Sequence, residues 1–450
     1  MTQTKMAEEL GRFASSLTFD QIPPDVVEFA KSLVLKTIAG MLAGAKCPNS
    51  SKMIDLVRAR SLPGEVGVIG TDLRTSIWEG ALLNAFSAHA SELEDVAIPD
   101  GGCSWDVTVI PLLLTLADRL NLSGKALIEA TVAGLEVHYR TSLPFDIMRL
   151  GQSLPTTSAM GCAAAAARAY GLGPEGITSA MGFALSGPAI TEASLGTDAH
   201  FLESALHALQ GLIGAEMAKM GLTSNPDIAS YGEMLSRKVT LQDAMADLGR
   251  HWFFTEMWVK KYPNSISIHR QLDALFALMA EHGLSYGDIE TVEVVAGVED
   301  QGCDRPDPQT NGDLQFSFQH ALGLAMLNGK LKVTDFLAET AQDARLAEAM
   351  KKVRVTIVRP DGPGAAEPVR YMSRPTTVNI LTRDGRSFGQ ERKAVFGSPE
   401  DPMRREDFAK VFTQYAADHI SAERLESTMA SVWALETVPD VSVLLRAFAA

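Results

Sequence analysis

Apolar residues recur at every third or fourth position along most of the first 255 residues, which is the period of a helix with one buried face. Ala and Gly are dense in these segments, as in AAAAARAY at 163–170, and small residues on helix faces permit close helix packing. Gly, Pro, Asn and Ser stand between the segments, where helices are expected to end. The pattern predicts a large helical domain built from residues 26–43, 77–93, 109–120, 124–141, 157–169, 174–185 and 202–220.

The pattern changes near Lys260. Three short stretches rich in β-branched residues follow, with alternating apolar positions, which predicts strands over 289–295, 353–358 and 377–381. Asp384-Gly385 is a turn signal between the last of these strands and the segment that begins at Ser387. Helical spacing lies between the strands, so we predict an α+β domain whose helices are 271–282, 318–328, 333–339 and 343–350.

After a loop at 397–403 the chain returns to helical spacing, over 405–417 and 422–430. We expect this tail to pack back on the helical domain. The predicted fold class is therefore mostly α, with a discontinuous all-helical domain of residues 1–260 and 405–450 and a smaller α+β domain of residues 261–404.

The composition is that of a globular protein, with 46% hydrophobic and 21% charged residues, and 450 residues are too many for one ordinary core. No window approaches the ~18 apolar residues of a membrane span, and the N-terminus lacks the features of a signal peptide. The four cysteines are scattered without CxxC spacing, which argues against a zinc site and against a disulfide framework. This pattern is typical of a protein of the reducing cytoplasm. The net charge of −15 without a basic stripe argues against a nucleic-acid partner.

The richest segment for chemistry is 84–111, where His89, Glu92, Glu94 and Asp95 follow an Ala-rich helical run and precede a glycine loop. Glu92 and Asp95 are three residues apart, so we expect them to share a helix face, where paired carboxylates can divide acid and base roles. The alternative, which is commoner, is that such a run of charged residues lies on a face exposed to solvent. His89 and Glu92 have metal-ligand spacing, but no second His-rich cluster accompanies them, so we predict no metal.

His200 falls in the first turn of a predicted helix that Thr197 or Asp198 can cap. A helix N-terminus lowers the proton affinity of an imidazole, which predicts a neutral base or a hydrogen-bond donor to a carboxylate; the alternative is an ordinary exposed histidine. Lys260 and Lys261 lie where helices give way to strands, and either can neutralise a substrate carboxylate or be solvated.

His320 lies in an apolar helix, where a satisfied core histidine is the commoner case. The chain has no GxGxxG after a strand, P-loop, GxSxG elbow or HExxH motif, so we predict no cofactor.

Several motifs, in this order and spacing, resemble the MmgE/PrpD family over nearly the whole chain. They are the segment 84–111, GLEVHYR (134–140), HALQGLIGAEMAKMGLTS (207–224), VKKYPNSISIH (259–269), FSFQHALGLAMLNG (316–329) and FGSPEDPM ending at Met403. The family includes 2-methylcitrate dehydratase, cis-aconitate decarboxylase and iminodisuccinate epimerase. The resemblance implies a large helical domain, a smaller α+β lid, an active site between them and a homodimer. The many Ala and Gly residues on the helix faces also favour association of two copies of the chain.

The reactive residues of the family transfer only in part. Its acidic motif AHxxDFDDTH reads AHASELEDVA here, so Glu92 stands at a catalytic Asp and Val96 at a Thr. The family's His-Pro dipeptide corresponds to Ser104-Trp105 here, and the histidine of its Gly-x-His-Pro turn corresponds to Ser153. The resemblance implies that these positions have changed chemistry.

The remaining family positions lie further along the chain. A family lysine at a helix start falls on His200, whereas a later lysine matches Lys260. A histidine or cysteine just after that lysine falls on Ser265, His269 fits a common family histidine, and His320 takes a tyrosine-like or histidine-like position. The scaffold is retained while the reactive set is rewritten.

The leading hypothesis is a cofactor-independent lyase, a dehydratase or decarboxylase, that abstracts a proton α to a carboxylate of a small di- or tricarboxylate. Lys260 would stabilise the enediolate, with His200 and Ser265 as donors. The base would be His200, His320 or Glu92, and the acid Glu92 or Asp95. The expected substrate-binding residues are Ser104, Ser153, Ser265, His269, Lys261 and His89.

Two rivals stay open. An epimerase or isomerase needs only bases on two faces of the substrate, and the histidines replaced by Ser104 and Ser153 would have been proton donors for dehydration. A catalytically silent binding protein is the other. If the family geometry holds, six residues converge in one cleft between the domains: Glu92, Ser104, His200, Lys260, Ser265 and His320.

Overall fold

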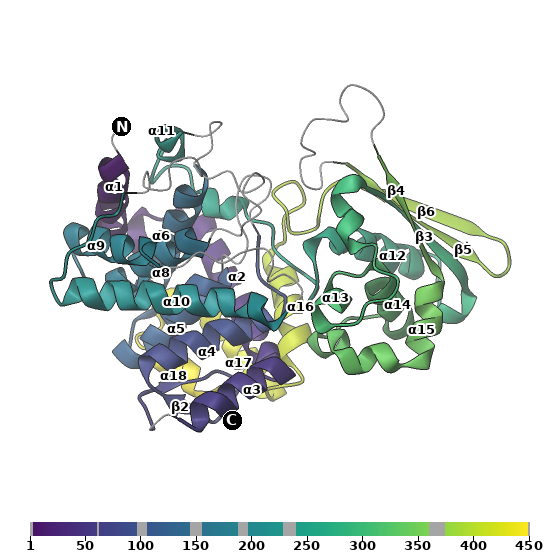
Figure 1. Cartoon of the computed structure of the whole chain (residues 1–450), viewed down its shortest axis with the longest axis horizontal. Coiled ribbons are helices and arrows are strands. Elements are labelled where there is room, and N and C mark those ends of the chain that lie inside the picture. Colours follow the sequence, from purple (N-terminus) through teal and green to yellow (C-terminus); the bar gives the residue numbers. More distant parts are fainter. Residues whose placement is uncertain are drawn as a thin grey trace. The chain divides into compact units, whose positions relative to one another are not determined.

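A computed structural model describes residues 3–60, 63–96, 106–144, 155–187, 197–227, 240–359 and 374–448. The chain divides into two compact units (Figure 1). The first, here the helical unit, comprises Met1–Ser194, Ala199–Met257 and Arg404–Ala450. The second, here the mixed unit, comprises Leu195–Asp198 and Trp258–Met403. Whether they fold as separate domains with the predicted limits stays a prediction.

The helical unit contains every helix predicted for it, with ends shifted by a few residues. Its α-helices are α1 (Gln3–Ser16), α2 (Pro24–Gly44), α3 (Pro48–Arg58), α4 (Ile77–Ala90), α5 (Asp106–Leu120), α6 (Gly124–Ser142), α8 (Pro155–Ala169), α9 (Pro174–Leu185), α10 (Asp198–Lys219), α11 (Leu241–Ala244), α16 (Arg405–Ala416), α17 (Ala422–Trp433) and α18 (Ser442–Arg446). A small antiparallel pair, β1 (Val66–Gly67) and β2 (Arg74–Thr75), is an addition that the periodicity did not predict.

Small residues bring these helices close together, as predicted. A Cβ added to Gly161 on α8 would lie 2.6 Å from His138 Cβ on α6, and one added to Gly134 would lie 2.7 Å from Ala165 Cβ. Larger side chains at these glycines would force α6 and α8 apart. The close packing of α6 on α8 therefore depends on the glycines.

Helix α4 ends earlier than predicted. The expected helix over 77–93 stops at Ala90, and Glu92 adopts a left-handed backbone with φ of 55°. A non-glycine residue in this region ends the helix and is costly to hold. The prediction that Glu92 and Asp95 share a helix face is therefore wrong, because both lie in the turn that follows α4.

The C-terminal helices α16 and α17 pack on α2. Lys31 of α2 donates a hydrogen bond to the carbonyl of Trp433 at 2.8 Å and pairs with Glu436 at 3.1 Å. These contacts join the two ends of the chain within the helical unit.

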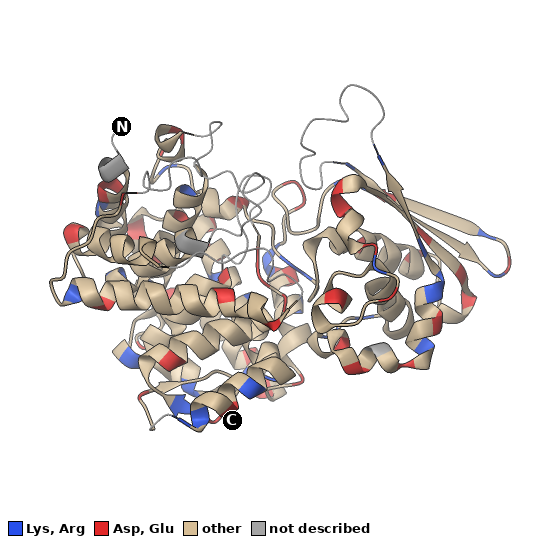
Figure 2. Cartoon of the chain, viewed as in Figure 1, with Lys and Arg blue, Asp and Glu red and all other residues tan. Residues whose placement is uncertain are grey.

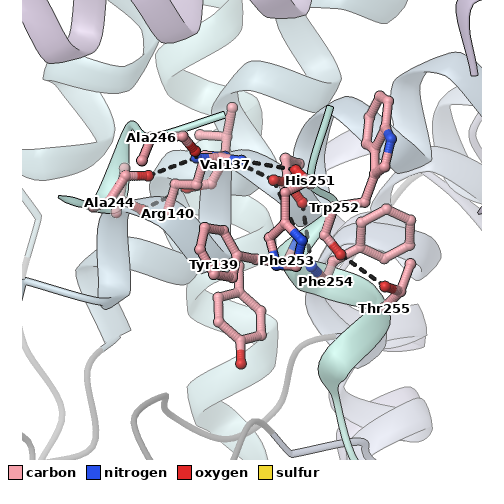
Figure 3. A network of polar contacts seen from close by, with 12 residues as sticks. Val137, Tyr139, Arg140, Ala244, Ala246, His251, Trp252, Phe253, Phe254 and Thr255 are labelled. Carbon is pink, nitrogen blue, oxygen red and sulfur yellow. Dashed lines mark hydrogen bonds and ion pairs between the residues drawn. The ribbon is translucent and has the colours of Figure 1, made fainter. Parts of the chain in front are cut away.

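A buried arginine fixes the segment of the helical unit that precedes the mixed unit (Figure 3). Arg140 on α6 donates to the carbonyls of Ala244, Ala246 and His251 at 2.7–2.9 Å and to Glu136 at 2.7 Å. Glu136 in turn accepts from the backbone of residues 253 and 254. The irregular segment that leads to the mixed unit is thereby anchored on α6.

The mixed unit is built on a four-stranded sheet of order β4-β3-β5-β6. The strands are β3 (Ile289–Gly297), β4 (Val353–Val358), β5 (Thr376–Thr382) and β6 (Ser387–Arg392), and only β3 and β4 are parallel. Gly385, with φ of 86°, makes the turn of the β5–β6 hairpin. The three predicted strands and the Asp384-Gly385 turn are confirmed.

Four α-helices accompany the sheet among the described residues of the mixed unit. They are α12 (His269–Glu281), α13 (Asn311–Gln315), α14 (Phe318–Asn328) and α15 (Ala344–Lys351). Helix α12 packs on β5 and β6, and α14 packs on β4. The predicted helix over 333–339 is wrong, since two 3₁₀ turns, Val333–Phe336 and Ala338–Gln342, are separated by an extended Leu337.

The mostly helical fold class is confirmed, whereas a lid role for the mixed unit stays a prediction. Across the described residues, no helix combines the length and the hydropathy needed to cross a membrane. Figure 2 shows acidic and basic residues interspersed over the described parts of both units. The homodimer, the cytoplasmic location and the lack of a nucleic-acid partner stay predictions.

Candidate active site

Residues 89–95 of the segment predicted to be richest in chemistry lie in a buried polar cluster of the helical unit. His89 is in the last turn of α4, and His200 is in the first turn of α10, as predicted. Glu92 and Glu94 come from the turn after α4, and none of these four residues is more than 6% exposed. Groups that normally seek water are thus gathered inside the unit, which is typical of a functional site.

His200 lies between carboxylates. Its Nε2 is 3.8 Å from Glu92 Oε1, and its Nδ1 is 3.6 Å from Oε2 of Glu203, one turn further along α10. Burial acts to lower the pKa of His200, but contact with Glu203 and the charge of Glu92 outweigh it, so the pKa is raised. The prediction of a lowered proton affinity is therefore wrong, because the neighbouring carboxylates raise the pKa by more than burial lowers it.

His89 packs edge-on against His200, with ring centroids 4.4 Å apart. Its Nδ1 shares a hydrogen bond of 2.7 Å with Ser204 Oγ on α10, which holds the imidazole in place. One ligand atom from each of His89, Glu94 and His200 lies within 4.8 Å of the others. Two histidines and a glutamate are a set that Zn²⁺ accepts, so the predicted absence of a metal stays a prediction.

Two further buried histidines, not singled out from the sequence, adjoin Glu203. His138 on α6 shares a hydrogen bond of 2.9 Å with Ser158, while His207 lies two turns after His200 on α10. Burial lowers the pKa of His138 well below its usual value and that of His207 to about 4. These two imidazoles are neutral at pH 7.

A buried ion-pair group lies on the other side of the 91–96 turn. Lys36 of α2 contacts Asp95 and the carbonyl of Leu93, and its Nζ is 3.5 Å from Asp106 Oδ2. Asp106 also accepts from the backbone N–H of Asp95 at 2.8 Å. Asp95, a predicted acid, is thus part of the anchor that fixes this turn. The sequence signal for this anchor was a single lysine, Lys36, within the apolar run SLVLKTIAG.

In the mixed unit, Lys260 is 2% exposed. Its neighbour Lys261 pairs with Asp273 of α12 at 2.9 Å and lies over the rings of Tyr262 and Phe396. Lys261, a predicted substrate ligand, therefore has an internal partner.

Ser265 and His269 lie on the same segment as Lys260, and both are buried. The Ser265 hydroxyl is 3.8 Å from Cys303 Sγ. His269 begins α12, and its pKa is lowered well below the usual value by burial and by the charge of Lys260. Lys260 and His269 are thus brought close enough to influence each other.

His320, on α14, is fully buried, and its Nε2 lies 3.0 Å from the carbonyl of Asp335. Burial lowers its pKa to about 4. The imidazole is neutral at pH 7 and donates to that carbonyl, while its Nδ1 has no hydrogen-bond partner within the described residues. A catalytic role for His320 stays a prediction.

Ser104 and Ser153 lie outside the described residues. Among the other predicted site residues, Glu92 and His89 gather round His200 in the helical unit, whereas Lys260, Ser265 and His269 share one segment of the mixed unit. Their convergence in a single cleft stays a prediction.

Comparison with known proteins places this architecture in a family. Residues 8–246 match the MmgE/PrpD N-terminal domain, and residues 262–435 match the MmgE/PrpD C-terminal domain. The chain is 23% identical to the cis-aconitate decarboxylase of Mus musculus over 466 aligned residues, which cover 99% of this chain and 94% of the relative. It is 25% identical to the cis-aconitate decarboxylase of Homo sapiens, over 83% of this chain and 79% of the relative.

A cis-aconitate decarboxylase-like protein of Aspergillus oryzae, oryM, is 25% identical over 97% of this chain and 96% of its own length. The N-terminal match alone spans more than half of the chain, and the two domain matches follow each other in order. The chain belongs to the MmgE/PrpD family.

Proposed function

We propose that this protein is a cofactor-independent lyase that transfers a proton at the carbon next to a carboxylate of a small di- or tricarboxylate. The observation that carries the proposal is His200, a buried imidazole whose pKa is raised by the carboxylates around it. A buried imidazole that can bind and release a proton away from water suits general acid–base catalysis. Family membership and the names of the relatives, cis-aconitate decarboxylases, support the same reaction class.

In the proposed reaction, Lys260 binds a substrate carboxylate and stabilises the negative charge that develops on it. The buried position of Lys260 strengthens this interaction, because little water competes for the charge. His200 exchanges a proton with the adjacent carbon, and Glu203 and Glu92 tune its pKa. The mechanism requires Lys260 and His200 to meet at one substrate.

The same groups serve either lyase reaction. In a dehydration, neutral His200 would take the α-proton while an acid such as Glu92 protonates the leaving hydroxyl, so that water departs. In a decarboxylation, the bond to one carboxylate breaks, CO₂ leaves, and protonated His200 would deliver a proton to carbon. The raised pKa keeps more His200 protonated than an ordinary histidine would be.

An epimerase is the second candidate. Glu92 and His200 are two proton carriers only 3.8 Å apart, and stereochemical inversion needs one group to remove a proton and another to return it. If both act from the same side of the substrate, inversion is impossible and the lyase is favoured.

Incubation with 2-methylcitrate, cis-aconitate and amino-dicarboxylates in deuterated buffer tests the proposal. A lyase consumes one of these acids, with loss of water or release of CO₂. An epimerase exchanges the α-hydrogen for deuterium and inverts the centre without net loss of substrate. A protein that binds an acid without exchange or turnover would contradict the proposed catalysis.

A further inference from the structure

The side chain of Asn264 is an unusual feature of the mixed unit. It is fully buried, yet within the described parts of the chain neither its Oδ1 nor its Nδ2 has a hydrogen-bond partner. Buried amides are nearly always paired, as Asn84 of the helical unit shows. Asn84 is 2% exposed, accepts from the N–H of Ile69 at 2.9 Å and donates to Gly67 and Thr115 at 3.2 and 2.9 Å.

The backbone around Asn264 is tightly held. Its own N–H bonds the Tyr262 carbonyl at 2.9 Å, and the N–H of Ser265 bonds the Gln315 carbonyl at 3.0 Å. The Tyr262 hydroxyl donates to Asp273 of α12 at 2.8 Å. These hydrogen bonds hold the backbone on both sides of the unpaired amide.

The residues nearest to Asn264 in sequence include the proposed anion ligand. Lys260 lies four positions before it, and the backbone of Asn264 approaches the imidazole of His269. Burial, together with the charge of Lys260, lowers the pKa of that imidazole and keeps it neutral. A cation, a neutral imidazole and an unpaired amide are thus gathered on one short segment.

We propose that Asn264 is a specificity residue that recognises a hydroxyl group on the carboxylate ligand. The inference rests on the proposed function, since it takes the carboxylate to bind at Lys260. An amide offers both a donor and an acceptor, whereas a carboxylate only accepts. A carboxylate alone would satisfy Nδ2 and leave Oδ1 unpaired, but a hydroxyl beside it can donate to Oδ1. The preferred ligand is therefore a hydroxy-carboxylate rather than its deoxy analogue.

Calorimetric titration with citrate and tricarballylate tests this preference, because the two tricarboxylates differ only by one hydroxyl. We expect wild-type protein to bind citrate about tenfold to a hundredfold more tightly, as a buried polar group left unpaired in the complex would cost the deoxy ligand that much. In Asn264→Leu, and in the smaller Asn264→Ala, the ratio should fall to about one.

Stability without ligand provides an independent readout. Asn264→Leu removes an unpaired buried amide, so its Tm should equal or exceed that of wild type. Asn84→Leu is the matched control, since it removes an equally buried but fully paired amide; it should lower Tm and keep the preference for citrate.

The outcomes separate the two ideas. Equal affinity of the wild-type protein for both acids would overturn the role of Asn264 and leave the carboxylate site intact. A preference for citrate that persists in both Asn264 variants, or a lower Tm in Asn264→Leu and Asn264→Ala alike, would also overturn that role. Failure of both acids to bind would overturn the proposed carboxylate site and the inference with it.

Discussion

Two buried histidines, one in each unit, have pKa values that are shifted in opposite directions. His200 is surrounded by the carboxylates of Glu92, Glu94 and Glu203, and its pKa is raised. His269 lies near Lys260, and its pKa is lowered well below the usual value. Both residues lie in the first turn of a helix and both are almost inaccessible to water, so neither burial nor helix position explains the difference. Neighbouring charge decides it.

The contrast suggests a division of labour between the units. The polar cluster of the helical unit is anionic and holds a histidine whose pKa is raised, which suits proton transfer. The 260–269 segment of the mixed unit is cationic and holds a histidine that stays neutral, which suits binding of an anion. A reaction on a carboxylate needs both properties.

Removal of the buried cation is expected to have the largest effect. Lys260→Met should lower kcat/KM by about a thousandfold, through both KM and kcat, because the charge faces the bound carboxylate and the developing enediolate. Steady-state kinetics on the substrate identified in deuterated buffer provides the measurement. Lys261→Met is the matched control, since Lys261 pairs with Asp273, and it should reduce stability more than turnover. Similar kinetic losses in both variants would show that the two lysines have no distinct roles.

Loss of the proton carrier should come next. His200→Gln should lower kcat by about a hundredfold while KM changes little, because general acid–base groups act in the transition state. His138→Gln replaces a buried histidine of the same region that is neutral in the fold, and it serves as the comparison. Wild-type turnover in His200→Gln would refute the proposed role of His200.

The influence of charge on His200 can be measured directly. Glu203→Gln removes a carboxylate that raises the pKa of His200, so the midpoint of the pH–rate profile assigned to His200 should move down by about one pH unit. The direction holds whether the acid or the base form is active. Glu216→Gln, also on α10 but bonded to Trp78 and Tyr170, should leave the midpoint in place. A midpoint that moves upward in Glu203→Gln would contradict the electrostatic account.

A smaller effect is expected on stability. His207 has a folded-state pKa of about 4, below the ordinary value of 6.5, despite the opposing charge of Glu203. Between pH 6.5 and 4 the unfolded chain binds a proton at this site that the folded chain does not, so the free energy of unfolding decreases as the pH falls.

That contribution is about 1.4 kcal/mol per pH unit, and His207→Gln should remove it. Urea denaturation at pH 6.5, 5.5 and 4.5 gives the slope, with His251→Gln as the control because its side chain is 48% exposed. Equal slopes in wild type and His207→Gln would show that His207 takes up its proton equally in both states.

Chelation should have no effect on activity. We expect the reaction to rely on Lys260 and His200, so treatment with a chelator followed by assay should give the untreated rate. Activity lost to the chelator and restored by Zn²⁺ would instead assign His89, Glu94 and His200 as metal ligands. The helical-unit cluster would then bind a cation rather than transfer a proton.

Much of the fold followed from local patterns in the chain. Helix α14 was predicted with its observed limits, and the three strands and the Asp384-Gly385 turn were predicted within two residues, because apolar spacing and turn chemistry act between near neighbours. The end of α4 was missed, since the left-handed backbone of Glu92 is stabilised by contacts distant in sequence. The 3₁₀ turns around Leu337 were missed because their spacing resembles that of a helix.

The sequence by itself determined which segments are helices and strands, the family, and two residues of the candidate site, His200 and Lys260. Only the tertiary structure decided the direction in which the pKa of His200 is shifted. The pKa of His200 depends on Glu92, more than a hundred residues away, as well as on Glu203 one turn along its helix, and no local pattern reports such a contact. The internal partner of Lys261 and the unpaired amide of Asn264 likewise emerged only from the folded chain. Periodicity is a property of neighbours in sequence, whereas electrostatics and hydrogen bonding depend on distances in space.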